Sequence, residues 1–124
     1  MAQSVCKQYA FRVDFEERAA FNRAVAARGR SAVKEIRRMV DEFLDDQSGR
    51  REIIHSFRAR EAQEFPHTEV RINALFNETA LRRFTVTCQY ANVTVNCVLR
   101  EMIVTYAREY EYASRLREVA VEAI

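Results

Sequence analysis

The sequence predicts a mainly helical protein with a two-stranded antiparallel ribbon, formed by two similar units in one chain. Only two glycines and one proline occur among 124 residues, which favours a compact helical domain. Two short stretches, Gln8–Val13 and Arg71–Phe76, alternate apolar and other residues as half-buried strands do. The apolar pattern of the first half recurs 63 positions later, so residues 1–124 are predicted to be one domain made of two repeats.

The repeat is clearest in its apolar positions. Residues 35–40 align with residues 98–103, and Phe21 aligns with Phe84. Gly29 aligns with Asn92, and these residue types most readily adopt the left-handed conformation that ends a helix. Polar positions hardly match, which indicates that the two copies share a structure and differ in surface.

The first copy is predicted to span residues 7–47. Asp14 is a plausible helix N-cap, and Glu16 and Glu17 follow where the helix dipole favours negative charge. The first helix should end near Arg28, and Ser31 should cap a second helix. The apolar stripe of that second helix is formed by Ile36, Met39, Val40 and Phe43.

The second copy is predicted to span residues 68–112. Asn77 is its candidate cap, Asn92 ends its first helix and Thr94 caps its second. Its predicted core positions are Leu81, Phe84, Cys88, Leu99, Met102, Ile103 and Tyr106.

Two segments lie outside the copies. The linker 48–67 contains Ile53, Ile54 and Phe57, which predict a short amphipathic helix before Pro66. Residues 113–124 are predicted to extend the last helix. Their apolar edge would pack on the molecule itself, mediate self-association or bind a protein partner, and consists of Leu116, Val119, Ala120 and Ile124.

Several functional classes find no support in the sequence. The three cysteines and two histidines lack the spacing of a metal site, so we expect neither a metal nor another cofactor. No nucleophile, base and carboxylate set and no glycine-rich phosphate loop occurs, so an enzyme is not expected. No apolar run reaches the roughly 18 residues of a membrane span, and we expect a cytoplasmic protein without membrane contact.

The charge distribution is more informative than the net charge of +2. Nine Lys or Arg and four acidic residues lie between Lys7 and Arg38, and acidic residues follow. Eighteen of the twenty basic residues are arginine, whose guanidinium suits bidentate recognition of phosphate or guanine.

The order of strand, helix, turn and helix, present twice, resembles the ribbon-helix-helix superfamily of Arc and MetJ. Residues 29–36 are similar to the family's turn and second helix, and the 17 positions from Arg12 to Gly29 match the family's spacing. The resemblance covers about 80 residues and implies a tandem, intramolecular pseudo-dimer. The tandem arrangement of two units in this one chain also resembles the TraY-type and VirC-type accessory proteins of conjugation and DNA transfer.

The resemblance implies that the ribbon enters the major groove of double-stranded DNA and reads bases there. Three alternating outward residues of each strand would contact bases. Carried over by position, these are Gln8, Ala10, Arg12, Arg71, Asn73 and Leu75. The start of each second helix would bind a phosphate, at Arg30 and Ser31 in one copy and at Val93 and Thr94 in the other.

Two roles remain open for such a protein, transcriptional regulation and an accessory role in plasmid conjugation. The alternative from a different class is an antitoxin-like interaction module that uses the C-terminal helix.

Overall fold

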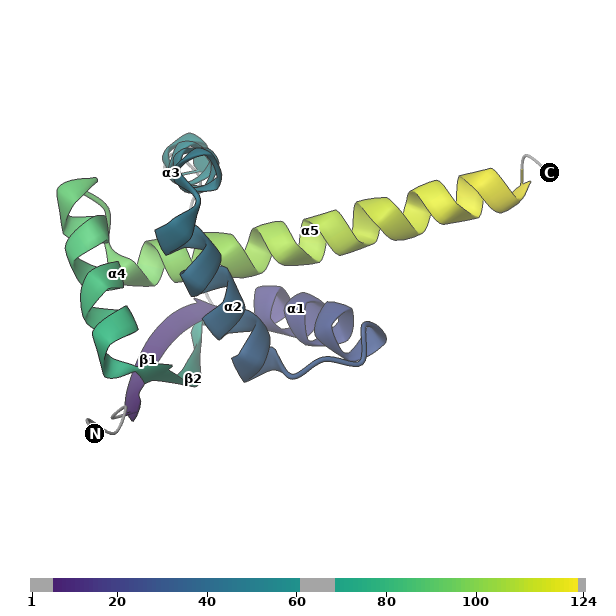
Figure 1. Ribbon diagram of the computed structural model, residues 1–124. Helices are drawn as coiled ribbons and strands as arrows, with labels where there is room; N and C mark the ends of the chain where they lie inside the picture. The colour runs from purple at the N-terminus through teal and green to yellow at the C-terminus, as the bar shows by residue number, and fades with distance from the viewer. Residues whose placement is uncertain (1–5, 61–68, 123–124) are drawn as a thin grey trace.

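The structure is a computed structural model that describes residues 6–60 and 69–122 (Figure 1). It is mainly helical and contains one two-stranded sheet, which confirms this part of the predicted fold class. In chain order the elements are β1 (Cys6–Asp14), α1 (Phe15–Ala27), α2 (Ala32–Asp45), α3 (Gln47–Arg60), β2 (Glu69–Asn77), α4 (Glu78–Tyr90) and α5 (Val95–Glu122).

The two strands pair antiparallel within the chain, as predicted. Cys6 lies opposite Asn77 and Asp14 lies opposite Glu69, so all nine residues of each strand are paired. The predicted ranges Gln8–Val13 and Arg71–Phe76 were too short by one or two residues at each end. Backbone pairing continues beyond the apolar alternation up to the residues that cap the next helices.

The order and the starting positions of the elements recur along the chain. The strand β2 and the helix α4 begin 63 residues after β1 and α1, and α5 begins 63 residues after α2. Two residues after the last residue of α1 and of α4 stands a residue with positive φ, Gly29 at 65° and Asn92 at 58°. Each end has the same backbone hydrogen bond across the turn, from Arg30 N–H to Val25 O (3.1 Å) and from Val93 N–H to Cys88 O (3.0 Å).

One shared core joins the two halves. The second helix of each half packs against the strand of the other half, α2 against β2 and α5 against β1. Two edge-to-face aromatic pairs also join the halves, Phe21 with Tyr106 at 5.3 Å and Phe43 with Phe84 at 5.2 Å between ring centroids. Neither half therefore buries its apolar surface alone.

The helix caps agree with the prediction at three of four sites. Asp14 forms a capping box with Glu17, and Asn77 accepts hydrogen bonds from the first turn of α4. Thr94 Oγ1 accepts the N–H of Cys97 at 3.2 Å. Ser31 occupies the N-cap position of α2 but its side chain makes no capping bond, so that prediction was wrong in its chemistry.

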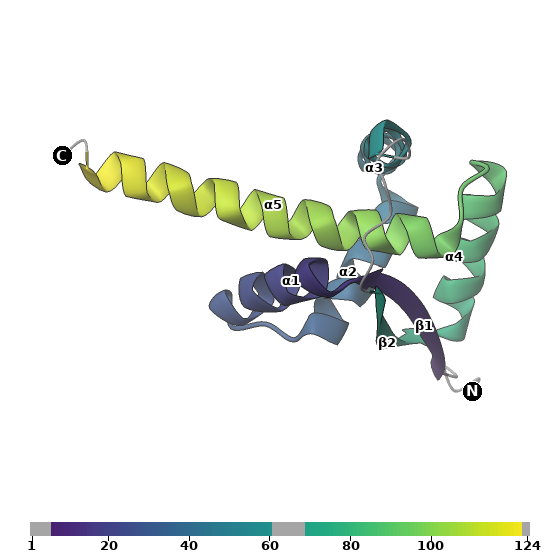
Figure 2. The same ribbon diagram turned by 180° about the vertical axis from the view of Figure 1, so that it is seen from behind.

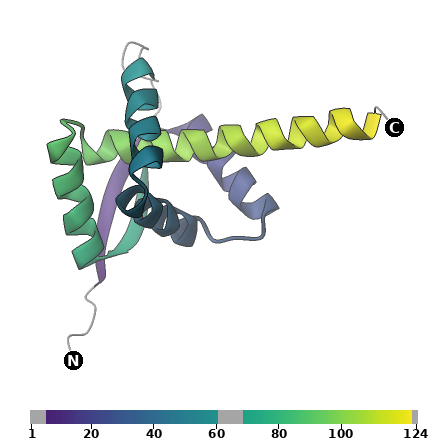
Figure 3. The same cartoon turned by 45° about the horizontal axis from the view of Figure 1, so that its top comes forward.

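The segment between the copies begins with α3. Ile53 and Ile54 pack against the core, as an amphipathic helix requires. The side chain of Phe57, and Pro66 with the rest of residues 61–68, lie outside the described part of the chain. In Figures 1 and 2, α3 lies above α5 and the ribbon lies below it, and Figure 3 shows α3 crossing α5.

The helix α5 is continuous through the predicted extension and projects beyond the other elements (Figures 1 and 2). Leu116 and Val119 are 52% and 62% exposed, and Ala120 is also exposed. The expectation that this edge packs on the molecule itself was therefore wrong for these residues, because the helix leaves the core before reaching them. Ile124 lies outside the described residues.

Candidate nucleic-acid interface

The outward face of the ribbon carries all six predicted base-reading side chains. Odd positions of β1 such as Phe11 and Val13 point into the core, so the even positions Gln8, Ala10 and Arg12 are exposed. In β2 the same alternation exposes Arg71, Asn73 and Leu75.

The strand register arranges these six residues in three rows. Gln8 lies opposite Leu75, Ala10 opposite Asn73 and Arg12 opposite Arg71. The small side chain of Ala10 therefore lies at the middle of the face. This arrangement leaves an open surface with long side chains at both ends.

The two ends of the face differ in charge. Arg12 and Arg71 lie together at one end, whereas Gln8 and Leu75 at the other end are uncharged. Like charges directly opposite each other destabilise a sheet. The only described ion pair of this row joins Arg12 Nη1 to Glu69 Oε2 at 3.6 Å, and both side chains are largely exposed. The basic end is thus open to an anionic or acceptor-rich partner.

The turn of the first copy is exposed but its arginine is engaged. Arg30 Nη1 lies 3.1 Å from Glu35 Oε1, and Glu35 is buried. Hydrogen bonds from Arg38 and then Arg30 lower the pKa of Glu35 to about 2, against the opposing effect of burial. The Ser31 side chain makes no capping bond to the first-turn N–H groups of α2. This turn presents a cation and the N-terminal end of a helix to solvent.

The turn of the second copy offers less to a phosphate. Val93 is partly buried and has no charged or hydroxyl group. Thr94 is exposed, but its hydroxyl oxygen already accepts the Cys97 N–H. The two predicted phosphate sites are therefore unequal in structure.

Two polar contacts from α5 at the basic end of the ribbon were not predicted from sequence patterns. Asn96, in the first turn of α5, hydrogen-bonds the backbone of Arg12. Arg100 Nε lies 2.8 Å from Glu17 Oε1, and the same carboxylate oxygen accepts the Asp14 N–H at 2.9 Å. The contacts of Asn96 with Arg12 and of Arg100 with Glu17 join residues more than 80 positions apart, a separation that no local sequence pattern reports.

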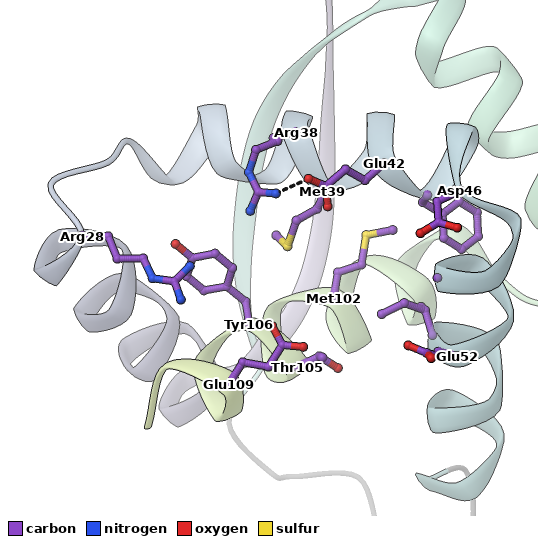
Figure 4. Close-up of a pocket in the computed structure, with 13 residues that line it drawn as sticks. Arg28, Arg38, Met39, Glu42, Asp46, Glu52, Met102, Thr105, Tyr106 and Glu109 are labelled. Carbon is purple, nitrogen blue, oxygen red and sulfur yellow. Dashed lines mark hydrogen bonds and ion pairs between the residues drawn. The ribbon is translucent and has the colours of Figure 1, made fainter. Parts of the chain in front are cut away.

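A cavity of about 300 Å³ is lined by residues of α2, α3 and α5 (Figure 4). Its apolar walls include Met39, Ile53 and Met102. Its charged residues are mainly acidic and consist of Arg28, Arg38, Glu42, Asp46, Glu52 and Glu109. An acidic surround does not suit a nucleic acid, so the ribbon face remains the candidate interface.

Other side chains give no second candidate. Within residues 6–60 and 69–122, no group of three or more His, Cys, Asp or Glu could hold a metal ion. Cys88 is a core residue as predicted, and burial raises the pKa of its thiol to about 12. None of the described helices has the combination of length and apolar character needed to cross a membrane.

The sequence matches no protein-family model, and no curated protein or solved structure is significantly similar to it.

Proposed function

We propose that this protein is a sequence-specific double-stranded DNA-binding protein that inserts its two-stranded ribbon into the major groove. The observation that carries the proposal is the exposed ribbon face, in which both strands present outward side chains able to contact base edges. Arginine pairs with guanine, Gln or Asn pairs with adenine, and an apolar side chain contacts the thymine methyl group. A two-stranded ribbon also has the dimensions that the major groove admits.

The proposed architecture is a tandem ribbon-helix-helix pseudo-dimer. It is supported by the equal spacing of the elements, the two matched turns and the packing of each second helix on the other strand. In this proposal the exposed turn at Arg30 and Ser31 binds a backbone phosphate and fixes the position of the ribbon. The unequal second turn at Val93 and Thr94 contributes less.

The function is tested by placing a negative charge at the centre of the ribbon face. Ala10 is exposed, so Ala10→Glu adds a carboxylate that would meet the DNA without entering the core. We expect the wild-type chain to retain duplexes from a random pool and the variant to lose that binding. Tyr90→Glu, at an exposed site on α4, is the matched control and should bind as wild type. Equal binding by both variants would contradict the proposal.

We infer a second activity, self-association through the projecting part of α5. Tyr112, Leu116 and Val119 are exposed at spacings of four and three residues, the spacing of a helix–helix seam. We infer that this segment binds the same segment of a second molecule of the protein, in antiparallel orientation about Ala113. Charges at equal distances from Ala113 are then opposite in sign, in the pairs Arg108–Glu118, Glu109–Arg117 and Glu111–Arg115.

Sedimentation analysis tests this association. We expect a dimer for the wild-type chain and a monomer for Leu116→Glu, with Tyr90→Glu as a control at a fully exposed site on α4. A monomeric wild type that gains mass only with another protein would favour the antitoxin-like interaction module and overturn the homodimer. The choice between transcriptional regulation and conjugation depends on whether bound genomic fragments lie at promoters or at a transfer origin.

A further inference from the structure

The side chain of Asn96 makes two hydrogen bonds to one residue of β1. Its Oδ1 accepts the N–H of Arg12 at 2.7 Å, and its Nδ2 donates to the C=O of Arg12 at 3.1 Å. The carboxamide therefore pairs with the strand edge as a residue of a third strand would. These two hydrogen bonds hold the backbone of Arg12 in place, although its side chain is exposed.

These bonds also define the geometry of the arginine row. Because the N–H and C=O of Arg12 point toward Asn96 and away from β2, Arg12 and Arg71 form a non-hydrogen-bonded antiparallel pair. Side chains of such pairs are the closest across a sheet, with Cα atoms about 4.5 Å apart. Like charges directly opposite each other destabilise a sheet, and the two hydrogen bonds from Asn96 hold the strand at this row from outside the ribbon.

A second connection supports the same end of β1. The Asp14 N–H donates to Glu17 Oε1, and the Glu17 carboxylate receives two hydrogen bonds from the Arg100 guanidinium at 2.8 and 3.1 Å. Glu17 and Arg100 are both largely buried, with exposed side-chain fractions of 15% and 18%. The helix α5 thus contacts β1 directly at Arg12, and it contacts Asp14 indirectly through Glu17 of α1.

We propose that Asn96 is a positioning residue that determines base specificity through Arg12. It joins the backbone of a base-reading residue to the first turn of α5, which follows the turn at Val93 and Thr94, the weaker of the two proposed phosphate sites. Arg12 then enters the groove at a fixed distance from the DNA backbone. This inference rests on the proposed DNA-binding function and assigns to that function a residue that does not itself touch DNA.

The arrangement is specific to one end of the ribbon. The position 63 residues before Asn96 is Val33, and the strand residue that corresponds to Arg12 is Leu75. A valine side chain has no hydrogen-bonding group, so it cannot hold the edge of β2 in this way. The asparagine contact therefore occurs at the end of the ribbon that carries the two arginines, and Val33 cannot make the same contact at Leu75.

The test compares Asn96→Ala with Asn22→Ala, a control that removes an exposed asparagine from α1. Affinities are measured for the duplex selected by the wild-type chain, for versions with each base pair changed, and for a scrambled duplex. We expect Asn96→Ala to lose about tenfold in affinity for the selected duplex, with the loss confined to the base pair read by Arg12. In an Arg12→Ala background, Asn96→Ala should cause no further change in base preference.

Amide hydrogen exchange gives a readout that does not depend on DNA. The Arg12 N–H should exchange at least about tenfold faster in Asn96→Ala than in wild type, while core amides stay protected. Unchanged exchange at Arg12 would overturn the inference alone, and so would faster exchange with unchanged base discrimination. A wild-type chain that binds no duplex would instead overturn the proposed function, and with it the positioning role.

Discussion

The two arginines of the ribbon differ in their surroundings although they lie opposite each other. Arg12 is held by Asn96 through its backbone and lies near Glu69 through its side chain. If both read guanine, Arg12→Ala and Arg71→Ala should each weaken specific binding by about 1–3 kcal/mol and relax preference at different base pairs. Titration of selected and scrambled duplexes measures both effects, with exposed Arg51→Ala on α3 as control. An equal loss on both duplexes would show that the arginine does not read a base.

Arg30 is expected to act differently, because a phosphate contact carries no base information. Arg30→Ala should weaken binding to all sequences and reduce the slope of log affinity against log salt by about one. Arg38→Ala is the matched control, since Arg38 also holds Glu35 but lies outside the turn. If Arg38→Ala changes the salt slope as much as Arg30→Ala, the effect comes from Glu35 and the phosphate contact is refuted.

Glu35 should make the stability of the fold depend on acidity. Its pKa is lowered from 4.5 to about 2, so its contribution is present above pH 4.5 and is lost as the pH falls toward 2. Glu35→Gln should lower the free energy of unfolding by about 2 kcal/mol at pH 7. Denaturant titrations should show the two proteins converging toward pH 2. A constant difference between them from pH 7 to pH 2 would contradict this assignment.

At this scale the sequence predicted exposure better than contacts. Alternation with a period of two identified all six outward strand residues, because a strand with one buried face permits no other arrangement. Asn96 was missed because its partner is 84 residues away. The hydroxyl of Ser31 was predicted to cap α2, but it forms no capping bond. Serine is preferred at N-cap positions, and this preference does not determine whether its side chain points to the first-turn N–H groups.

At the scale of elements, the two turns give a direct comparison of glycine with asparagine. Both residues adopt positive φ, and a Cβ atom added at Gly29 would meet nothing within 4 Å. Gly29→Ala should therefore cost about 1 kcal/mol from backbone strain alone, while Asn92→Gly should be nearly neutral. Thermal or denaturant unfolding measures both. A destabilisation of several kcal/mol by Gly29→Ala would show that steric contacts, and not φ, determine the residue at this turn.

The elements themselves were largely predictable from the sequence. Strands, helix stops and three caps were identified, because each depends on residues close together in the chain. Whether the end of the last helix packs on the core was not predictable from the sequence. An apolar edge at Leu116 and Val119 is compatible with burial or exposure, and only the direction in which α5 leaves the core decides between them.

For the protein as a whole, the pairing of two different strands gives the exposed ribbon face two unlike ends. Antiparallel register brings the end of one strand to the beginning of the other, so both arginines share one end. The sequence placed an arginine in each strand but did not reveal that they meet. The basic end should read guanines, while Gln8 and Leu75 suit an A·T pair through adenine and the thymine methyl group.

Selection of bound duplexes from a random pool by the wild-type chain is the most direct test of this account. Each mismatch should cost about 1–3 kcal/mol, which is enough to resolve every contacted base pair. We expect an asymmetric site with guanines at one end and an A·T pair at the other, and Arg12→Ala should remove preference only at the guanine end. A clean palindrome with one chain on each half-site would mean that whole chains act as equivalent readers. That result, or the absence of any enriched sequence, would contradict the central claim.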